Sequence, residues 1–392
     1  MTTDKLHDAL ITRQQKGVYR TRKKIHNHKN ARVRVDDKTL INFCSNDYLG
    51  LAVNEKVIRA FQQQADEMGV GSGSAHLICG HSTVHHALEE ELADFTGRER
   101  SLLFSTGYMA NLGTITALCK HGDSVFEDKL NHASLLDGGL FSGATFRRYP
   151  HNNTTRLSQL LSTTTDGEKM IITDGVFSMD GDVADLRTLS NLAREHDAWL
   201  MVDDAHGLGV LGQTGGGIVE TLSLSPHDVP ILMGTLGKAF GTFGAFISGS
   251  HTLIETLIQS ARSYIYTTAL PPAIAQATRA SLKIVIEETW RREKLQALIT
   301  QFTAGARQLG LPLMPSNTPI QPLLVGESVR ALEMSEKLFE AGFLVSAIRP
   351  PTVSQGKARL RITLSALHES EDVNQLLETL AIIHRSYSYN VK

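Results

Sequence analysis

The sequence lacks the features of a secreted, membrane-spanning or nucleic-acid-binding protein. Its 392 residues hold only 3 cysteines, too few and too scattered for a disulfide framework, so we expect a reducing, cytoplasmic compartment. No apolar run approaches the roughly 18 residues of a transmembrane helix, and the polar N-terminus has no signal-peptide core. The 39 basic and 41 acidic residues nearly balance, at a net charge of −2, which argues against a general polyanion binder. We therefore expect neither a membrane nor a nucleic acid as partner.

The composition is that of a globular protein with ample material for a core. Hydrophobic residues make up 41% and charged residues 20% of the chain, and the 32 glycines and 11 prolines form no biased tract. At about 150 residues per domain, the length predicts two or three folding units.

Short apolar runs alternate with amphipathic stretches in the first two thirds of the chain. The stretch 88–95, for example, places Leu88, Leu92 and Phe95 on one helical face. Continuous apolar strands that alternate with helices predict an α/β architecture, in which a mainly parallel sheet is covered on both faces. The expected strands include 101–107, 169–175, 198–207, 230–235 and 244–249.

The composition changes near residue 281, where a charged helical stretch begins. Further apolar runs and another helical pattern follow it. We therefore predict a smaller C-terminal α+β domain over 281–392, a large domain over 41–280 and an N-terminal segment over 1–40.

Two phosphate-binding patterns are incomplete. GLGVLG (207–212) follows an expected strand, as a dinucleotide-binding loop does, but the chain continues QTGGG, which is a poor start for the helix that such a site needs. Lys238 does not complete a P-loop, because Ala239 follows it where Ser or Thr is required. A nicotinamide-dependent oxidoreductase therefore remains only a minor alternative.

Histidines and a cysteine in CGHSTVHH (79–86) offer at most a weak metal site. Cys79, His81 and His85 provide at most three local donors, and metal ligation needs ligands that converge. We expect surface or supporting histidines here and no metal.

A stronger group of residues contains Asp203, His206 and Lys238. Lys238 lies in a glycine-rich turn just after a buried-looking strand, and a lysine at the edge of a core more readily releases its proton for Schiff-base chemistry. Asp203 ends another expected strand. A Schiff-base lysine and an acidic partner for the ring nitrogen are what pyridoxal 5'-phosphate (PLP) needs from a protein. The turn and expected helix at 105–113 would add backbone N–H groups for the phosphate.

Seven segments, in order and at typical spacing, resemble the α-oxoamine synthases, which are PLP enzymes of fold type I. The segments are SNDYLGL (45–51), GSGSAHLICG (71–80), FSTGYMANLG (104–113), NHASLLDG (131–138), DGVFSMDGD (174–182), VDDAHGLGVLG (202–212) and GTLGKAFG (234–241). The resemblance covers nearly the whole chain. It implies the PLP-dependent transferase fold, with a seven-stranded, mainly parallel sheet in the large domain, and an acyltransferase activity.

The resemblance also implies roles for individual residues. Lys238 would bind PLP covalently and act as general base, Asp203 would pair with the ring nitrogen, and His132 would stack on the ring. The other implied cofactor contacts are Gly107, Tyr108, Ser178, His206 and Thr235. The implied substrate contacts are Arg20, Asn46, His132, Thr352 and Arg361, with Arg359 as a competitor for the amino-acid carboxylate. Tyr108 and Asp174 depart from the residues expected in this family, phenylalanine and glutamate.

The segments AIRPPTV (347–353) and ARLRIT (358–363) resemble the branch of the family that condenses L-alanine with a pimeloyl thioester, carried by coenzyme A or by an acyl carrier protein. The nearest alternative is a relative that condenses glycine with a short acyl-CoA, such as a glycine C-acetyltransferase or a 5-aminolevulinate synthase. A non-catalytic partner subunit is an alternative from another class. The resemblance further implies a homodimer.

Overall fold

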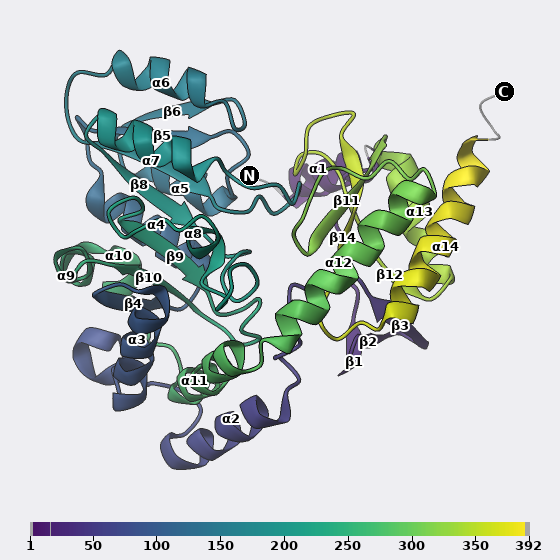
Figure 1. Ribbon diagram of the computed structural model, residues 1–392, viewed down its shortest axis with the longest axis horizontal. Helices are drawn as coiled ribbons and strands as arrows, with labels where there is room; N and C mark the ends of the chain where they lie inside the picture. The colour runs from purple at the N-terminus through teal and green to yellow at the C-terminus, as the bar shows by residue number, and fades with distance from the viewer. Residues whose placement is uncertain (1–2, 16, 389–392) are drawn as a thin grey trace. The chain divides into compact units, whose positions relative to one another are not determined.

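The computed structural model describes residues 3–15 and 17–388, which divide into two compact units (Figure 1). The larger unit comprises residues 49–178 and 182–292, and the smaller one groups the described residues up to 48 with 179–181 and 293 onward. The predicted boundaries after residues 40 and 280 stay a prediction. None of the helices in the described part of the chain combines the length and the hydropathy that a bilayer crossing requires.

The larger unit contains the predicted seven-stranded sheet. Its strand order is β4-β10-β9-β8-β7-β5-β6, and all neighbours are parallel except β10, which is antiparallel to both β4 and β9. This mainly parallel sheet confirms the fold class expected from the sequence. The strands are β4 (Arg100–Phe104), β5 (Ser124–Asp128), β6 (Thr145–Tyr149), β7 (Lys169–Asp174), β8 (Ala198–Asp203), β9 (Ile231–Thr235) and β10 (Ala245–Gly249).

Helices cover both faces of this sheet. Successive strand residues point to opposite sides, so each strand contributes side chains to both layers of core. Met201 of β8 belongs to one buried cluster, whereas its neighbours Leu200 and Val202 belong to another. The first cluster includes residues of α4 (Gly107–Leu118), α5 (Ala133–Phe141), α9 (His251–Ser260) and α10 (Arg262–Ile265) or their caps. The second includes residues of α6 (Thr154–Ser162), α7 (Leu186–Glu195) and α8 (Gly217–Thr221).

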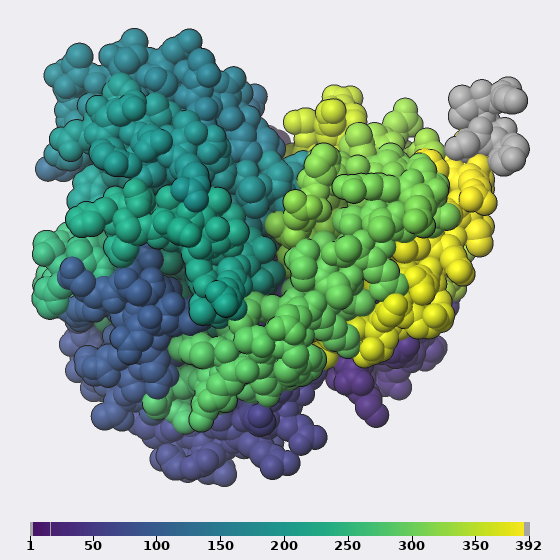
Figure 2. Space-filling view, in the orientation of Figure 1, coloured from purple at the N-terminus to yellow at the C-terminus, as the bar shows by residue number. Residues whose placement is uncertain are grey.

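The remaining helices of the larger unit pack against one another. Helix α11 (Pro272–Glu287) packs against α2 (Glu55–Met68) and against α3 (Thr83–Thr96). Figure 2 shows α2 and α11 on the surface of this unit, in indigo and green. A single π-helical turn, η1 (His76–Gly80), precedes α3.

The smaller unit contains two sheets. One has the order β1-β2-β3-β12 and joins N-terminal strands to a C-terminal one, and the other has the order β11-β14-β13. The strands are β1 (Ile25–Lys29), β2 (Arg32–Val35), β3 (Lys38–Asn42), β11 (Ile320–Gly326), β12 (Phe343–Leu344), β13 (Ser346–Ile348) and β14 (Ala358–Thr363). The helices are α1 (Thr3–Gln15), α13 (Ser328–Glu340), α14 (Ser370–Ser388) and most of α12 (Trp290–Gln308).

A charged cluster ties the loop after β6 to the loop before α7 in the larger unit. His151 lies 3.0 Å from Asp128 and 2.7 Å from Asp182, and its ring meets Phe177 edge-on. Burial lowers the pKa of the His151 imidazole, but the hydrogen bonds and the charges of the two carboxylates outweigh burial and raise the pKa to about 10. The imidazole is therefore cationic at neutral pH and stabilises the folded chain.

We predict that His151→Gln lowers the free energy of unfolding by about 1.5–3 kcal/mol near neutral pH, the range for hydrogen bonds to charged groups. Because the folded-state pKa lies above the ordinary value of 6.5, this stabilisation is complete below that pH and disappears as the pH rises to about 10. Urea unfolding across this range measures the difference. His121→Gln, at an exposed histidine of the same unit, is the control, and a pH-independent loss in the His151 variant would contradict the ion-pair account.

Candidate active site

Polar side chains meet beyond the carboxyl ends of the central strands of the larger unit. They line a cavity of about 190 Å³. The structure brings together in this cavity all the predicted cofactor contacts: Gly107, Tyr108, His132, Ser178, Asp203, His206, Thr235 and Lys238. Parallel strands place the ends of β7, β8 and β9 at one edge of the sheet, which is where open α/β sheets bind ligands.

Asp203 ends strand β8 and points to the same face of the sheet as Met201, two residues earlier. Its side chain is buried and accepts two hydrogen bonds. Oδ1 accepts the backbone N–H of Ala205 at 3.0 Å, and Oδ2 accepts the amide of Asn111 at 2.7 Å. A buried carboxylate needs such donors. The strand end and these donors together hold a carboxylate in the wall of the cavity.

Lys238 follows β9 in a tight turn whose Gly241 N–H bonds back to the Lys238 carbonyl at 2.8 Å. Its Nζ lies 2.8 Å from Nε2 of His206, which follows β8. The ammonium charge also lowers the pKa of the Asp174 carboxyl, although burial and the negative charge of Asp203 together hold that pKa well above its usual value. An amine and two carboxyl groups therefore influence one another across this cavity.

The first turn of α4 presents backbone N–H groups beside the cavity. The Thr106 hydroxyl caps this helix by accepting the Met109 N–H at 3.2 Å, and the N–H groups of Gly107 and Tyr108 have no partner within the helix. A β-carbon at position 107 would lie 2.6 Å from Cε of Met233, so glycine keeps this wall open. Thr235, at the end of β9, adds a hydroxyl to the lining.

His132 is the N-cap of α5, and its Nδ1 accepts the Ser134 N–H at 3.3 Å. The backbone N–H of His132 donates to Asp174 Oδ2 at 3.0 Å. Burial, the largest influence, lowers the pKa of its imidazole; the Asp203 charge opposes this shift and the Lys238 charge adds to it. The ring is therefore neutral at pH 7, and because Nδ1 is an acceptor, its proton sits on Nε2.

The predicted substrate contacts other than His132 lie in the smaller unit, where they form two pairs. Nη1 and Nη2 of Arg361 donate to Asn46 Oδ1 at 3.3 and 3.2 Å, and Arg20 Nη2 donates to Thr352 Oγ1 at 3.4 Å. The competitor Arg359 is engaged elsewhere, in an ion pair with Asp180. The structure thus distinguishes the two arginines of β14.

Several residues in the cavity were not among the predicted contacts. They are Asn111, Ser134, Asp174, Val176, Ala205 and Met233. Asp174 had a signal, because it ends an expected strand at the chemically active edge of the sheet. Asn111 had a weaker one, because it lies four residues after Gly107 and thus on the same helical face. For the apolar Met233, nothing in the sequence distinguishes cavity wall from core.

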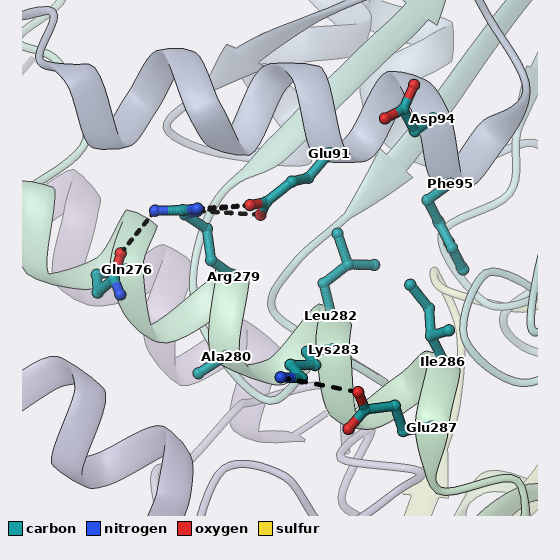
Figure 3. A pocket seen from close by; sticks show the side chains of 10 residues that line it. All are labelled: Glu91, Asp94, Phe95, Gln276, Arg279, Ala280, Leu282, Lys283, Ile286 and Glu287. Carbon is teal, nitrogen blue, oxygen red and sulfur yellow. Dashed lines mark hydrogen bonds and ion pairs between the residues drawn. The ribbon is translucent and has the colours of Figure 1, made fainter.

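A larger cavity, of about 630 Å³, lies between α3 and α11 (Figure 3). Four of its charged side chains form two ion pairs. Arg279 points at Glu91 and binds both carboxylate oxygens, and Lys283 lies 3.8 Å from Glu287. None of the predicted catalytic residues lines it. Its size alone therefore does not make it the active site.

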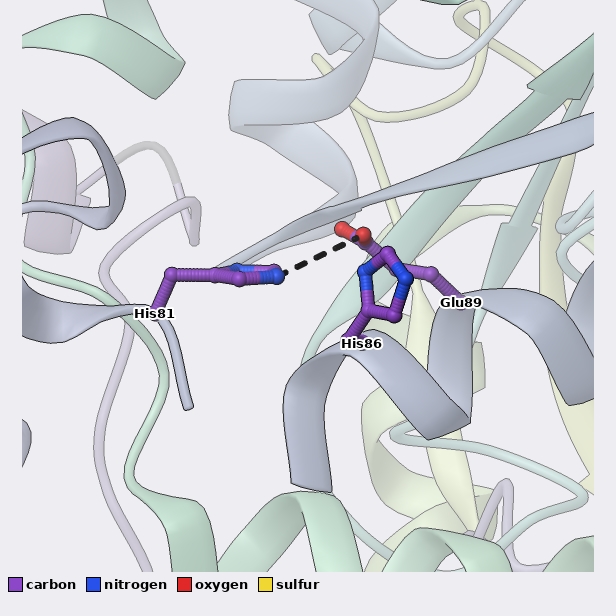
Figure 4. A group of neighbouring side chains, drawn as sticks. All are labelled: His81, His86 and Glu89. Carbon is purple, nitrogen blue, oxygen red and sulfur yellow. Dashed lines mark ion pairs between the residues drawn. The ribbon is translucent and has the colours of Figure 1, made fainter. Parts of the chain in front are cut away.

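The histidines after η1 do not form the metal site that sequence spacing allowed. His85 uses both ring nitrogens, one at 2.8 Å from the Ser82 hydroxyl and one on the carbonyl of Leu270. Ligand atoms of His81, His86 and Glu89 instead lie within 4.8 Å of one another (Figure 4). This spacing is short enough for the three side chains to share a metal ion, and the expectation of no metal here stays a prediction.

The family of the chain follows from comparison with known proteins. Residues 38–380 match the family model "Aminotransferase class I and II". The chain belongs to this family.

Curated relatives over nearly the full length carry a more specific name. The 8-amino-7-oxononanoate synthase of Saccharophagus degradans is 60% identical and is matched over 98% of this chain and 97% of its own. The enzyme of the same name from Pseudomonas putida KT2440 is 59% identical over 95% of both chains.

Solved structures agree with the fold. A serine palmitoyltransferase of S. paucimobilis, described with a bound PLP–myriocin aldimine, has a TM-score of 0.93 at 27% identity over 98% of both chains. The 8-amino-7-oxononanoate synthase of Francisella tularensis has a TM-score of 0.78 at 35% identity, over 89% of this chain and 99% of its own. The expected PLP fold type I and the PLP cofactor are thereby confirmed.

The residues of the cavity fit PLP. The amine of Lys238 suits the cofactor aldehyde, the buried carboxylate of Asp203 suits the protonated ring nitrogen, and the α4 N-terminus with Thr235 suits the phosphate. Each of the three chemical parts of the cofactor therefore has a matching group in the cavity.

We predict that the purified chain absorbs visible light and that borohydride fixes the cofactor to Lys238, as peptide mass spectrometry would show. Lys238→Ala should lose the fixed adduct entirely. Lys169→Ala, at a half-buried lysine whose Nζ binds the His196 carbonyl at 3.0 Å, is the control and should retain it. An adduct on another lysine, or a protein that stays colourless with added PLP, would contradict this assignment.

Proposed function

We propose that the chain catalyses the decarboxylative condensation of L-alanine with a pimeloyl thioester. The products are 8-amino-7-oxononanoate, carbon dioxide and the free thiol, so this is a C-acyltransferase step of biotin biosynthesis. The observation that carries the proposal is the identity of 58–60% to synthases of this name over 95% or more of this chain. The cavity supplies the amine, carboxylate and imidazole that such a reaction requires.

Asp203 has the role of keeping the cofactor ring charged. When bound, PLP withdraws electrons from the α-carbon of the amino acid and so makes its proton acidic. A carboxylate about 4 Å from a pyridinium nitrogen is worth about 4 kcal/mol at an effective dielectric constant near 20. The Asp203 carboxylate therefore favours the protonated ring across neutral pH. Its loss should slow proton removal more than it weakens cofactor binding.

Lys238 has two roles in this proposal. Its amine would hold PLP covalently in the resting protein. When it is not bound to the cofactor, the same amine would take the α-proton of alanine as general base and would return a proton after decarboxylation. His206, 2.8 Å away, keeps the amine beside the cavity. The same nitrogen thus serves in binding and in proton transfer.

His132 would stack on the cofactor ring, and its ring N–H would be a hydrogen-bond donor. Its neutral imidazole carries the proton on Nε2, as the hydrogen bonds to Nδ1 require. That N–H is suited to the oxygen of the thioester carbonyl, on which negative charge develops when the α-carbon attacks. A donor already held in place lowers the energy of this step.

The arginines of the smaller unit are suited to the carboxylates of the substrates. Arg361 presents a planar guanidinium beside Asn46, a geometry that binds the alanine carboxylate through two hydrogen bonds. Arg20 and Thr352 form the second pair, which we assign to the acyl substrate. Under this assignment, coenzyme A and an acyl carrier protein are both suitable acyl carriers.

The main competing function uses another amino acid and acyl group. Serine palmitoyltransferases share the fold at TM-scores of 0.93–0.94, so the scaffold itself does not specify the substrates. Glycine-using α-oxoamine synthases are the corresponding alternatives. The higher identity to 8-amino-7-oxononanoate synthases favours alanine and pimeloyl thioester.

Two alternatives from other classes have less support. A non-catalytic partner subunit has no need for Lys238, Asp203 and His132 in one cavity. A dinucleotide site at 207–212 lacks its helix, because the next helix is the five-residue α8, which begins at Gly217. We retain a homodimer as part of the proposal, since PLP sites of this fold commonly lie at subunit interfaces. A cytoplasmic location is also part of the proposal.

We predict that mass spectrometry detects 8-amino-7-oxononanoate after incubation with L-alanine and pimeloyl-CoA. Alanine labelled at its carboxyl carbon should give unlabelled product, and alanine labelled at its methyl carbon should give labelled product. Because one methyl group in a pocket is worth about 10–200-fold in discrimination, alanine should exceed glycine by that factor in kcat/KM. Faster turnover of glycine with acetyl-CoA would replace this function by the alternative one.

We predict that Arg361→Lys raises the KM for alanine by about 10–100-fold, because a point charge replaces a guanidinium that forms two hydrogen bonds. Steady-state kinetics with varied alanine provides the measurement. Arg359→Lys is the matched control, because Arg359 is bound to Asp180 and should affect stability rather than KM. The opposite pattern would move the carboxylate site to Arg359.

A further inference from the structure

Asn111 connects two groups of the candidate site. One is Asp203, which we assign to the nitrogen of the cofactor ring, and the other is His132, which we assign to a face of that ring. It lies in α4, four residues after Gly107, and its side chain is fully buried. Its Nδ2 donates to Oδ2 of Asp203 at 2.7 Å and to Oγ of Ser134 at 2.8 Å. One amide nitrogen therefore touches residues of β8 and α5 at once.

The second contact leads on to His132. Because Ser134 Oγ accepts a hydrogen bond from Asn111 Nδ2, the hydroxyl proton is available to donate, and His132 Nδ1 lies 2.7 Å away. Nδ1 also accepts the Ser134 backbone N–H, so both hydrogen bonds require an unprotonated Nδ1. The chain of bonds runs from Asp203 through Asn111 and Ser134 to His132. It is consistent in every donor and acceptor.

The other atom of the amide supports this interpretation. Oδ1 of Asn111 is buried and, among the described residues, has no hydrogen-bond partner. An unpaired buried carbonyl destabilises the fold. The partners of this amide among the described residues are therefore all on its N–H side, at Asp203 and Ser134.

We propose that Asn111 is a positioning residue that fixes the Asp203 carboxylate and, through Ser134, the tautomer of His132. The inference rests on the proposed function for the roles of these two partners. It adds that one side chain positions both groups: the Asp203 carboxylate, which we assign to the ring nitrogen, and the His132 imidazole, which we assign to the ring face. The role uses the two N–H donors of the amide, which a carboxylate or an alkyl group of equal size does not have.

The test compares three variants by their affinity for PLP and by the absorbance of the bound cofactor, neither of which requires turnover. Asn111→Leu removes both donors at similar volume and should weaken PLP binding by about 10–100-fold. Ser134→Ala interrupts only the branch to His132 and should have a smaller effect on affinity. Thr114→Val is the control: it lies in the same helix, is fully buried, and loses a hydroxyl that has no partner among the described residues.

Asn111→Asp separates positioning from a merely structural role through pH. A carboxyl group there faces Asp203 and donates only when protonated, so PLP affinity should recover as the pH falls. The Asn111→Leu defect should show no such recovery. Other titratable groups line the same cavity, and subtracting the wild-type profile removes their effects; they are Tyr108, His132, Asp174, Asp203, His206 and Lys238.

The outcomes for this inference and for the proposed function are distinct. If Asn111→Leu binds PLP as Thr114→Val does, with the same absorbance, the positioning role is wrong even when the wild-type chain makes the product. If the Asn111 variants lose affinity in the predicted pattern but the wild-type chain makes no 8-amino-7-oxononanoate, the positioning role stands and the proposed function falls. Equal pH profiles for Asn111→Asp and Asn111→Leu would also overturn the inference.

Discussion

The site depends on one buried carboxylate, that of Asp203, at the end of a central strand. Taking a carboxylate out of water is unfavourable unless donors replace the water, and here Ala205 and Asn111 supply them. The position follows from the strand itself: the period of two residues turns Asp203 to the face covered by α4 and α5. The cavity, the lysine turn and the helix N-terminus are arranged around this charge.

The neighbouring carboxyl group shows how strongly that charge acts. Burial and the negative charge of the nearby Asp203 raise the pKa of the Asp174 carboxyl well above its usual value, so this carboxyl gains a proton more readily than one in water. Asp174 then serves to hold the backbone of His132 through a 3.0 Å hydrogen bond. Two adjacent strand ends thus carry the same residue type in different roles, set by donors and burial.

Much of the fold was predictable, because its signals are local. The strand 198–203 is an apolar run bounded by polar loops, and the residues after it, with Lys238, already indicated the cofactor chemistry. Other features depend on contacts between distant segments. The pairing of Phe343 with Ile41 and the contact of Arg361 with Asn46 join opposite ends of the chain.

The same limit explains the side chains that sequence reasoning did not find. Arg359 and Arg361 lie two residues apart on one strand, so periodicity gives them the same face, and only the ion pair of Arg359 with Asp180 separates them. Asn111 and Ser134 are ordinary helix residues until α4 and α5 pack beside β8. Their roles come from tertiary packing, which the local pattern does not encode.

A crystal structure of the chain loaded with PLP tests the central claim most directly. The account predicts continuous electron density from Nζ of residue 238 to the cofactor, with an oxygen of Asp203 within hydrogen-bond distance of the ring nitrogen. A cofactor bound through another residue, or a ring nitrogen facing away from that carboxylate, would contradict it.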